Sequence, residues 1–226
     1  MSTGPISPYL VPDFYADALA KGRHRDIVGG RWDETGRVQM AALRAEGLMP
    51  HHRLLDIGAG SLRLGCKAVP YLDPGQYWGT DLSGALMQRG YDLELADKAR
   101  LPQTQLIEDP DFSFPGVPPI IDYAIAFAVF THLPMGHLAT SLKNLHAQFP
   151  TLKRLLFTVF LAPDAVTAKT QYRQPDGVVT HPNRAPYHLL HEDILALCQA
   201  AGFTVDRRDT QLPRGQILFV AQRKLG

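Results

Sequence analysis

Leu54-Leu55-Asp56-Ile57-Gly58-Ala59-Gly60-Ser61-Leu62-Arg63-Leu64-Gly65 is a short apolar run that ends in an acid and continues into a glycine-rich turn. This pattern predicts a β-strand, a tight turn and the start of a helix. The glycines at 58 and 60 let the backbone turn sharply and approach a ligand, because neither carries a Cβ. Asp56 brings a carboxylate to the end of the strand. The stretch therefore predicts a ligand site at one edge of an α/β sheet.

A second acid follows the next predicted strand. Tyr77-Trp78-Gly79-Thr80-Asp81-Leu82-Ser83 is an extended aromatic segment that ends in Asp81. In an α/β unit, an acid roughly 20 residues after the glycine turn is placed to accept hydrogen bonds from a ribose diol. Two acids and a glycine turn together predict a nucleoside pocket.

These residues resemble the class I S-adenosylmethionine-dependent methyltransferases. The positions that match the first motif of the family, acid-x-Gly-x-Gly, and its second-strand acid are Asp56, Gly58, Gly60 and Asp81. Asp111-Phe112 and the segment 121–133 look like the third and fourth motifs of bacterial small-molecule members of this class. The matches lie within residues 50–220, and they are specific for the class but not for the substrate.

Other classes of nucleotide-binding protein also use a glycine-rich turn. A nicotinamide-dependent dehydrogenase needs a third glycine three positions after the second. Arg63 occupies that position, and Gly65 comes two residues too late. A triphosphate-binding loop is excluded because no Gly-Lys-Ser/Thr follows the turn. A glycine turn with a purely structural role remains as an alternative.

The composition is that of one globular domain. The chain has 226 residues, of which 45% are apolar, enough for a single sizeable core. Its 23 basic and 22 acidic residues leave a net charge of +1, which argues against a nucleic-acid partner. We find no signal peptide and no run of about 18 apolar residues. We therefore expect a cytoplasmic protein with no membrane partner; its oligomeric state stays unknown.

The order of the predicted elements indicates an α/β fold. Strands are expected at about 53–57, 76–81, 104–108, 121–127 and 153–160. Helices between them indicate a parallel sheet covered on both faces. A late helix, Leu189 to Ala201, is expected to stop at Gly202, and strands at 203–208 and 216–221 to form an antiparallel hairpin. The resemblance implies the same arrangement, a Rossmann-like, mostly parallel sheet of seven strands with a C-terminal antiparallel hairpin.

The N-terminal part is expected to differ from the rest. Residues 1–48 are predicted as a helical extension, and residues 49–226 as the class I methyltransferase domain. In this family a helical N-terminal segment commonly lies over the cofactor cleft as a lid. Trp32 is expected near the cofactor or the substrate, with packing on the domain as its alternative role.

The resemblance implies how each matched position meets S-adenosylmethionine. The glycine turn would pass beneath the methionine moiety, whose amino group Asp56 would orient, while Asp81 would bind the ribose. Leu82 and the pair Asp111-Phe112 would meet the adenine, although Asp109 is close enough in sequence to compete. The expected cofactor-binding residues are Asp56, Gly58, Ala59, Gly60, Asp81, Leu82, Asp111, Phe112, Phe127, Ala128 and Trp32. Leu62 departs from the family, because many members have a third glycine there.

Methyl transfer from a sulfonium depends mainly on alignment of donor and acceptor, and a base is needed only when the acceptor carries a proton. His132, after the predicted fourth strand, is the best candidate base because an imidazole titrates near neutral pH. Its alternative role is to begin the next helix. His181, near the end of a long irregular stretch at 162–186, and Tyr187 and His188, just after it, are candidates for acceptor contact or for the base. His188 and His191 have a spacing that would also suit a metal, but we expect none.

The sequence therefore predicts a methyltransferase that uses S-adenosylmethionine and acts on a small polar molecule. A hydroxyl of a sugar or secondary metabolite is the favoured acceptor. N- or C-methylation of a natural product is the nearest alternative. A methyltransferase-like binding module without turnover is a further one.

Overall fold

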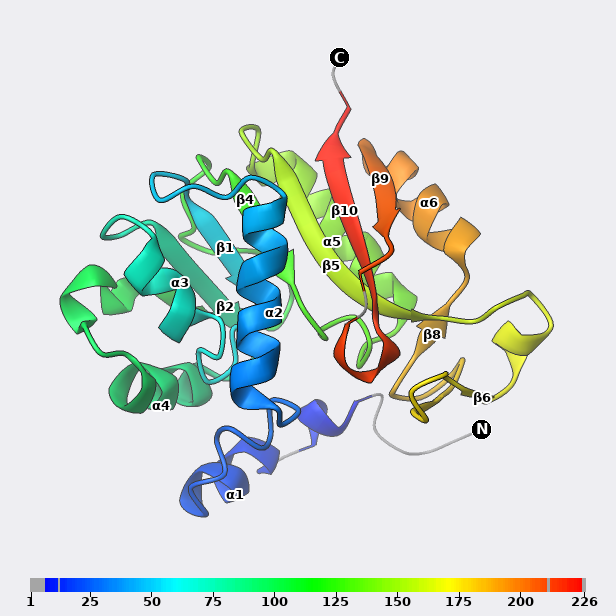
Figure 1. Ribbon diagram of the computed structural model, residues 1–226, viewed down its shortest axis with the longest axis horizontal. Coiled ribbons are helices and arrows are strands. Elements are labelled where there is room, and N and C mark those ends of the chain that lie inside the picture. Colours follow the sequence, from blue (N-terminus) through cyan, green and yellow to red (C-terminus); the bar gives the residue numbers. More distant parts are fainter. Residues whose placement is uncertain (1–6, 12, 211, 225–226) are drawn as a thin grey trace.

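The computed structural model describes residues 7–11, 13–210 and 212–224 (Figure 1). Its main sheet has the strand order β3-β2-β1-β4-β5-β10-β9. These strands are β1 (Leu54–Ile57), β2 (Tyr77–Asp81), β3 (Leu106–Glu108), β4 (Tyr123–Ala126), β5 (Arg154–Leu161), β9 (Phe203–Arg208) and β10 (Ile217–Arg223). The first five run parallel, and β10 is antiparallel to both β5 and β9. The predicted fold class, including the C-terminal hairpin, is confirmed.

Helices cover both faces of this sheet (Figure 1). They are α1 (Phe14–Ala20), α2 (Trp32–Ala45), α3 (Gly65–Tyr71), α4 (Gly84–Glu94), α5 (Met135–Gln148) and α6 (His191–Ala200). The helix α6 ends as predicted, because Gly202 takes the left-handed conformation with φ +86°. Trp32 is the first residue of α2.

The expected irregular stretch 162–186 contains short elements of its own. A 3-10 turn, Thr167–Lys169, precedes β6 (Tyr172–Arg173) and β7 (Val179–Thr180), which form a separate two-stranded sheet. The short strand β8 (His188–Leu189) then pairs with the end of β5. The long connection is therefore attached to the main sheet rather than hanging free of it.

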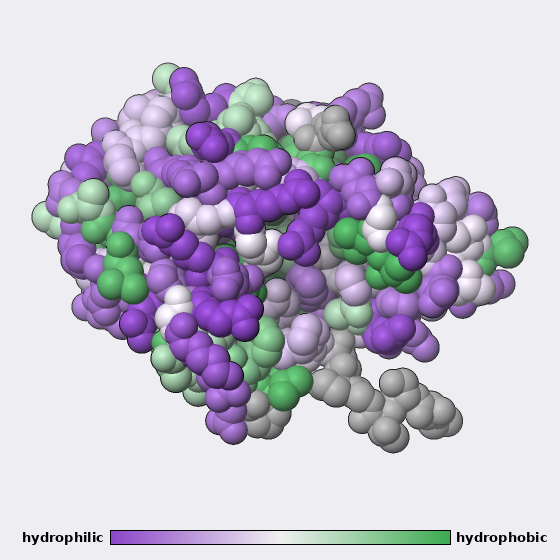
Figure 2. Space-filling model, turned by 60° about the horizontal axis from the view of Figure 1, so that its bottom comes forward, coloured by the Kyte–Doolittle hydropathy of each residue, from purple (hydrophilic) through white to green (hydrophobic). Residues whose placement is uncertain are grey.

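Hydrophilic residues predominate on the face drawn in Figure 2, and hydrophobic residues form small, separate patches there. Such scattered apolar residues are normal for a protein surface. Among the helices of the described residues, none is long and apolar enough to cross a membrane.

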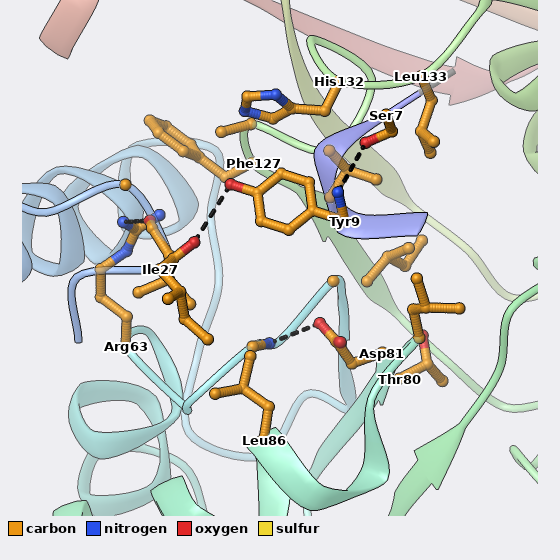
Figure 3. Close-up of a pocket in the computed structure, with 18 of the residues that line it drawn as sticks. Ser7, Tyr9, Ile27, Arg63, Thr80, Asp81, Leu86, Phe127, His132 and Leu133 are labelled. Carbon is orange, nitrogen blue, oxygen red and sulfur yellow. Dashed lines mark hydrogen bonds between the residues drawn. The ribbon is translucent and has the colours of Figure 1, made fainter. Parts of the chain in front are cut away.

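The strand order reverses beside β1, which pairs with both β2 and β4. In open α/β sheets, ligands bind outside the carboxyl ends of the strands at such a reversal. A pocket lies there, with Thr80 and Asp81 at the end of β2 in its wall (Figure 3). The helix α1 and the 3-10 turn Pro8–Leu10 lie at this same edge (Figure 1).

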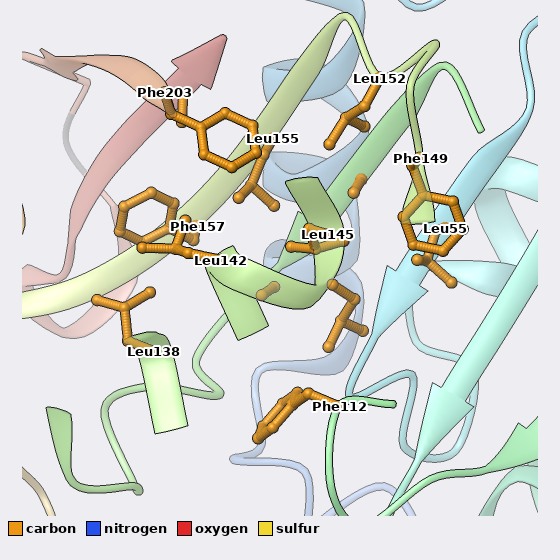
Figure 4. Packing of buried hydrophobic residues seen from close by; sticks show 14 of the residues in the cluster. Leu55, Phe112, Leu138, Leu142, Leu145, Phe149, Leu152, Leu155, Phe157 and Phe203 are labelled. Carbon is orange, nitrogen blue, oxygen red and sulfur yellow. The ribbon is translucent and has the colours of Figure 1, made fainter. Parts of the chain in front are cut away.

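Alternate residues of each central strand enter two different cores. Leu55 of β1 and Phe157 of β5 belong to the cluster that contains residues of α5 and α6. Side chains of α5 pack on β5 in this cluster (Figure 4). Leu54 of β1 belongs to the other cluster, with residues of α2, α3 and α4. Burying each such side chain contributes about 1.5–3 kcal/mol to stability, so both helical layers hold the strands in place.

The second helix of the N-terminal extension takes part in the second core. Leu43 of α2 is fully buried, and Leu48, just after the helix, is almost fully buried. Both belong to the cluster that contains Leu54 and Leu156 of the sheet. The sheet is therefore packed directly against α2.

Candidate functional site

The pocket has a volume of about 190 Å³ and is built from six parts of the chain. These parts are the N-terminal segment, the glycine turn after β1, the ends of β2 and β4, the loop after β3, and the turn between β9 and β10. Tyr9, from the N-terminal segment, projects between these walls (Figure 3). Residues far apart in sequence therefore meet at the carboxyl edge of the sheet.

At Gly58 and Gly60, the glycine turn leaves no room for a side chain. Gly58 and Gly60 have φ of +71° and +55°, in the left-handed region. A Cβ on Gly58 would lie 2.4 Å from Val129 Cγ2, and a Cβ on Gly60 would lie 2.7 Å from Val28 Cγ1. Leu62, which stands where many family members have glycine, also has a positive φ of +61° and is fully buried. The turn thus keeps the glycine-like conformation there, and burial of the leucine side chain offsets the backbone strain.

Asp81 ties the end of β2 to the glycine turn. Its carboxylate accepts hydrogen bonds from the backbone N–H groups of Gly60, at 2.8 Å (Figure 3), and Ser83, at 2.9 Å. Burial raises the pKa of Asp81 to about 6, against the lowering effect of these two bonds. A carboxylate has about four lone-pair sites, so Asp81 has capacity for further donors in the pocket.

Asp56 lies beneath the glycine turn and does not line the pocket. Its side chain is 2% exposed and accepts a 2.6 Å hydrogen bond from the Tyr77 hydroxyl. Burial raises the pKa of Asp56 to about 7, although the bond from Tyr77 lowers it. The first acid of the motif therefore links β1 to β2.

The raised pKa of Asp56 predicts how stability depends on pH. The unfolded chain loses this proton near pH 4, whereas the folded chain keeps it until about pH 7. The folded state binds more protons in that interval, so the free energy of unfolding should fall as pH rises from about 4 to 7, by roughly 4 kcal/mol from this group. Asp81 acts in the same direction.

Asp56→Asn keeps an acceptor for Tyr77 but cannot titrate. We expect the variant to have a flatter stability curve between about pH 4 and 7 in urea unfolding. Asp81 contributes to the slope that remains. A variant with the same slope as the wild type would contradict this account of Asp56.

The two acids after β3 are placed differently. Asp109 lines the pocket and is buried, and its carboxylate accepts the backbone N–H groups of Ser113, at 3.0 Å, and Phe114, at 2.9 Å. Asp111 is exposed and does not line the pocket. Phe112 lines it with a positive φ of +55°. Of the competing acids, Asp109 is the one in the pocket wall.

His132 follows β4 and lines the pocket. Burial, together with the positive charge of Arg214, lowers the pKa of His132 to about 4, so the ring is neutral near pH 7. Its Nδ1 is buried and has no hydrogen-bond partner within the described part of the chain. The ring packs edge-on against Tyr9, with 4.9 Å between centroids.

The predicted site residues fall into two groups. Those that line the pocket are Gly58, Gly60, Asp81, Leu82, Phe112, Phe127, Ala128 and His132. Those that lie elsewhere are Trp32, Asp56, Ala59, Asp111, His181, Tyr187 and His188. The roles proposed for both groups stay predictions.

The histidines of the long connection hold its short elements together. The imidazole of His188 lies 2.8 Å from Thr180 Oγ1 through Nδ1 and 3.3 Å from the Ala168 carbonyl through Nε2. The backbone N–H of Tyr187 donates to the Thr131 carbonyl. Trp32 has the guanidinium of Arg25 over its ring, 5.2 Å from the centroid. These contacts connect secondary-structure elements to one another.

Sequence reasoning missed several lining residues, among them Tyr9, Tyr15, Arg63, Arg214 and Gln216. Arg63 belongs to the glycine turn that the sequence places at the ligand site, so its presence in the pocket wall could have been predicted. The others come from the N-terminal segment and the hairpin turn, where no periodic pattern marks an inward-facing side chain. No cluster of three or more His, Cys, Asp or Glu side chains suited to a metal ion occurs among the described residues.

The sequence matches no family model. It also matches none of the curated proteins with which it was compared. Solved structures are similar in fold. Magnesium protoporphyrin IX methyltransferase (ChlM) from Synechocystis PCC 6803 with bound SAM has 16% identity and a TM-score of 0.66, over 99% of this chain and 100% of that chain.

Two further structures hold S-adenosylhomocysteine. The DhpI complex has 10% identity and a TM-score of 0.61, over 91% of this chain and 94% of that one. The glycopeptide N-methyltransferase MtfA has 12% identity and a TM-score of 0.58, over 83% of this chain and 86% of that one. This chain therefore has the fold of the S-adenosylmethionine-dependent methyltransferases over nearly its whole length.

Proposed function

We propose that this chain is a class I methyltransferase that uses S-adenosylmethionine to methylate a small polar acceptor. The observation that carries the proposal is the position of Asp81. Its buried carboxylate and the glycine turn to which it is hydrogen-bonded share one wall of the pocket, at the carboxyl edge of the sheet. An acid and a glycine turn placed in this way suit a ribose and the methionine moiety attached to it.

The residues present fit this cofactor. S-adenosylmethionine supplies a methyl group on a sulfonium; the acceptor atom bonds to that carbon as the carbon–sulfur bond breaks and its electron pair stays on sulfur. Asp81 would accept from the ribose hydroxyls, and Gly58 and Gly60, which line the pocket, would present the backbone of the turn to the cofactor. Phe112 and Leu82 offer apolar surface for the adenine, and Phe127 and Ala128 for the methionine end.

The N-terminal segment is proposed as a lid. Ligand pockets typically measure roughly 300–1,000 Å³, and this cavity, at about 190 Å³, is smaller. Tyr9 fills part of the space, with its hydroxyl donating to the Ile27 carbonyl at 3.2 Å (Figure 3). We propose that this segment moves outward to admit the cofactor and then closes to exclude water.

The acceptor proposed is an oxygen, such as a hydroxyl of a sugar or secondary metabolite. Polar groups in the wall support it, because Tyr9, His132 and Gln216 are able to exchange hydrogen bonds with a hydroxylated molecule. His132 would take the hydroxyl proton as an uncharged imidazole; its pKa of about 4 makes it a weaker base than the near-neutral imidazole expected from the sequence. N- or C-methylation of a natural product is the second candidate, since an aromatic and apolar wall also suits such acceptors.

The unpaired Cys66 and Cys198 suit a reducing compartment, and we propose the cytoplasm.

Calorimetric titration with S-adenosylhomocysteine and with a nicotinamide dinucleotide tests the cofactor class. We expect S-adenosylhomocysteine to bind in the micromolar range, about 8 kcal/mol, and the dinucleotide not to bind. Transfer of a labelled methyl group to a panel of sugars, phenols and amines then tests turnover. Binding without transfer to any acceptor would favour a binding module. Preference for the dinucleotide would overturn the proposal in favour of a dehydrogenase.

A further inference from the structure

Two arginines meet at one segment of the pocket wall. Arg63 Nη1 donates to the Val28 carbonyl, and Arg214 Nη2 donates to the Gly29 carbonyl, each at 2.6 Å. A Cβ on Gly29 would lie 4.0 Å from Arg63 Nη1. The two guanidinium groups therefore bind successive carbonyls of one short segment, residues 28–29, although they come from the glycine turn and from the hairpin turn between β9 and β10.

Neither guanidinium forms an ion pair with a carboxylate of the described residues. Across the described ranges of the chain, no ion pair includes Arg63 or Arg214. Arg63 is only 8% exposed, and its buried Nε has no hydrogen-bond partner among the described residues. Burial lowers the pKa of Arg63 to about 10, which leaves it charged at neutral pH. A buried cation with an unused donor is costly unless an anion binds to it.

The acids of the pocket wall and the acid beneath the glycine turn accept their hydrogen bonds from groups other than these two arginines. Asp81 accepts two backbone N–H groups, and Asp109 holds the loop after β3. Asp56 attracts Arg63 electrostatically but is bonded to Tyr77 outside the pocket lining. The carboxylates of Asp81 and Asp109 line the same cavity as the two arginines, but among the described residues neither forms an ion pair with Arg63 or Arg214.

The proposed cofactor does not neutralise the charge of the two arginines. Its methionine part has one carboxylate, but its ammonium and sulfonium groups give the molecule a net positive charge. Two arginines and a net cation against the two lining carboxylates, Asp81 and Asp109, leave one positive charge in excess in the cavity. The acceptor is the ligand that remains to supply the matching negative charge.

We propose that Arg63 and Arg214 form an oxyanion site for a carboxylate or phosphate group on the acceptor, so that the substrate class is an acidic small molecule. This inference rests on the proposed function. Arg214, on the exposed hairpin turn, would meet the anion at the pocket mouth, and its planar fork suits a bidentate contact. Arg63 would meet it from the buried side.

The oxyanion bound by the two arginines could also come from the cofactor, as its methionine carboxylate. One experiment distinguishes an acceptor oxyanion from the cofactor carboxylate. Inorganic phosphate, as the oxyanion probe, is titrated into the full chain with and without S-adenosylhomocysteine, at constant ionic strength. The variants are Arg63→Gln and Arg214→Gln. Arg173→Gln is the matched control, because Arg173 is exposed and also donates to a carbonyl, that of Gly177.

We expect saturable phosphate binding that persists in the S-adenosylhomocysteine complex. Arg63→Gln and Arg214→Gln should each weaken it by about tenfold or more, because a charge-assisted hydrogen bond is lost. Arg173→Gln should leave it unchanged. Thermal unfolding checks that the Arg63 variant is folded; if it is not, the exposed Arg214 carries the test alone.

A second comparison uses S-adenosylhomocysteine and its decarboxylated analogue. If Arg214→Gln leaves their affinity ratio unchanged, the acidic-acceptor proposal is supported. If S-adenosylhomocysteine displaces phosphate and Arg214→Gln reduces the ratio, the site serves the cofactor carboxylate and the proposal is overturned. Absence of saturable phosphate binding in the wild type overturns it too. Arginine-dependent phosphate binding without any S-adenosylhomocysteine binding would contradict the proposed function but not the oxyanion site.

Discussion

Asp81→Ala is expected to weaken the binding of S-adenosylhomocysteine by about 100-fold or more. Two contributions combine. The ribose loses a charged acceptor, and hydrogen bonds to charged groups are worth about 1.5–3 kcal/mol each. The backbone N–H of Gly60 also loses its acceptor, so the glycine turn loses one of its contacts with the end of β2, while the N–H groups of Gly58 and Ala59 still donate to the Thr80 carbonyl. Isothermal titration calorimetry measures the change.

Glu192→Ala is the matched control for Asp81→Ala. Glu192 is an exposed acid on α6, and α6 contributes no residue to the pocket wall. This variant removes the same charge and should bind S-adenosylhomocysteine as the wild type does. Asp81→Asn keeps the shape of the side chain but not its charge. Its affinity for S-adenosylhomocysteine should lie between those of Asp81→Ala and Glu192→Ala. An Asp81→Ala protein within about threefold of wild-type affinity, less than 1 kcal/mol, would contradict the ribose assignment.

Gly90→Ala is expected to give the largest loss of stability. Gly90 is buried in α4, where a Cβ would lie 2.3 Å from the Ser61 carbonyl oxygen and 2.4 Å from its carbonyl carbon. Because both neighbours are backbone atoms, no rotamer change relieves the clash. Overpacking of this kind costs typically 1–3 kcal/mol, and we expect about 3 kcal/mol or more in urea unfolding. Cofactor affinity should fall as well, since Ser61 belongs to the glycine turn.

Gly136→Ala provides the helix control. Gly136 lies in α5, and a Cβ there would meet nothing within 4 Å. Alanine is the better helix former, so this variant should be as stable as the wild type or more stable by up to about 1 kcal/mol. If Gly90→Ala were equally harmless, α4 would not pack on the glycine turn as described.

The strands and the glycine turn were predictable because their signals are local. Leu54-Leu55 and Tyr77-Trp78 begin short runs that suit buried strands, and each run ends in an acid at the edge where parallel strands place their carboxyl ends. Gly202 marked the end of α6 because a left-handed residue there favours glycine. The predicted pocket position follows from these elements by the geometry of α/β sheets alone.

Which acid lines the pocket depended on packing. Asp56 stands in the motif, but Tyr77 on the neighbouring strand takes its carboxylate below the turn. Asp109 and Asp111 are two residues apart, and only the loop's hydrogen bonds to Asp109 decided which of them faces inward. Sequence spacing carries no information about such side-chain directions in an irregular loop.

The sequence by itself determined the strand and helix order, the glycine turn and the class of ligand site, because these depend on periodicity and on backbone conformations that few residues allow. Only the tertiary structure brought Tyr9, Arg63 and Arg214 to three successive carbonyls at residues 27–29. These side chains come from the N-terminal arm, the glycine turn and the C-terminal hairpin. Their meeting depends on how α2 packs on the sheet and how β10 pairs with β5, since contacts between distant segments arise from the shared core and leave no local pattern in the chain.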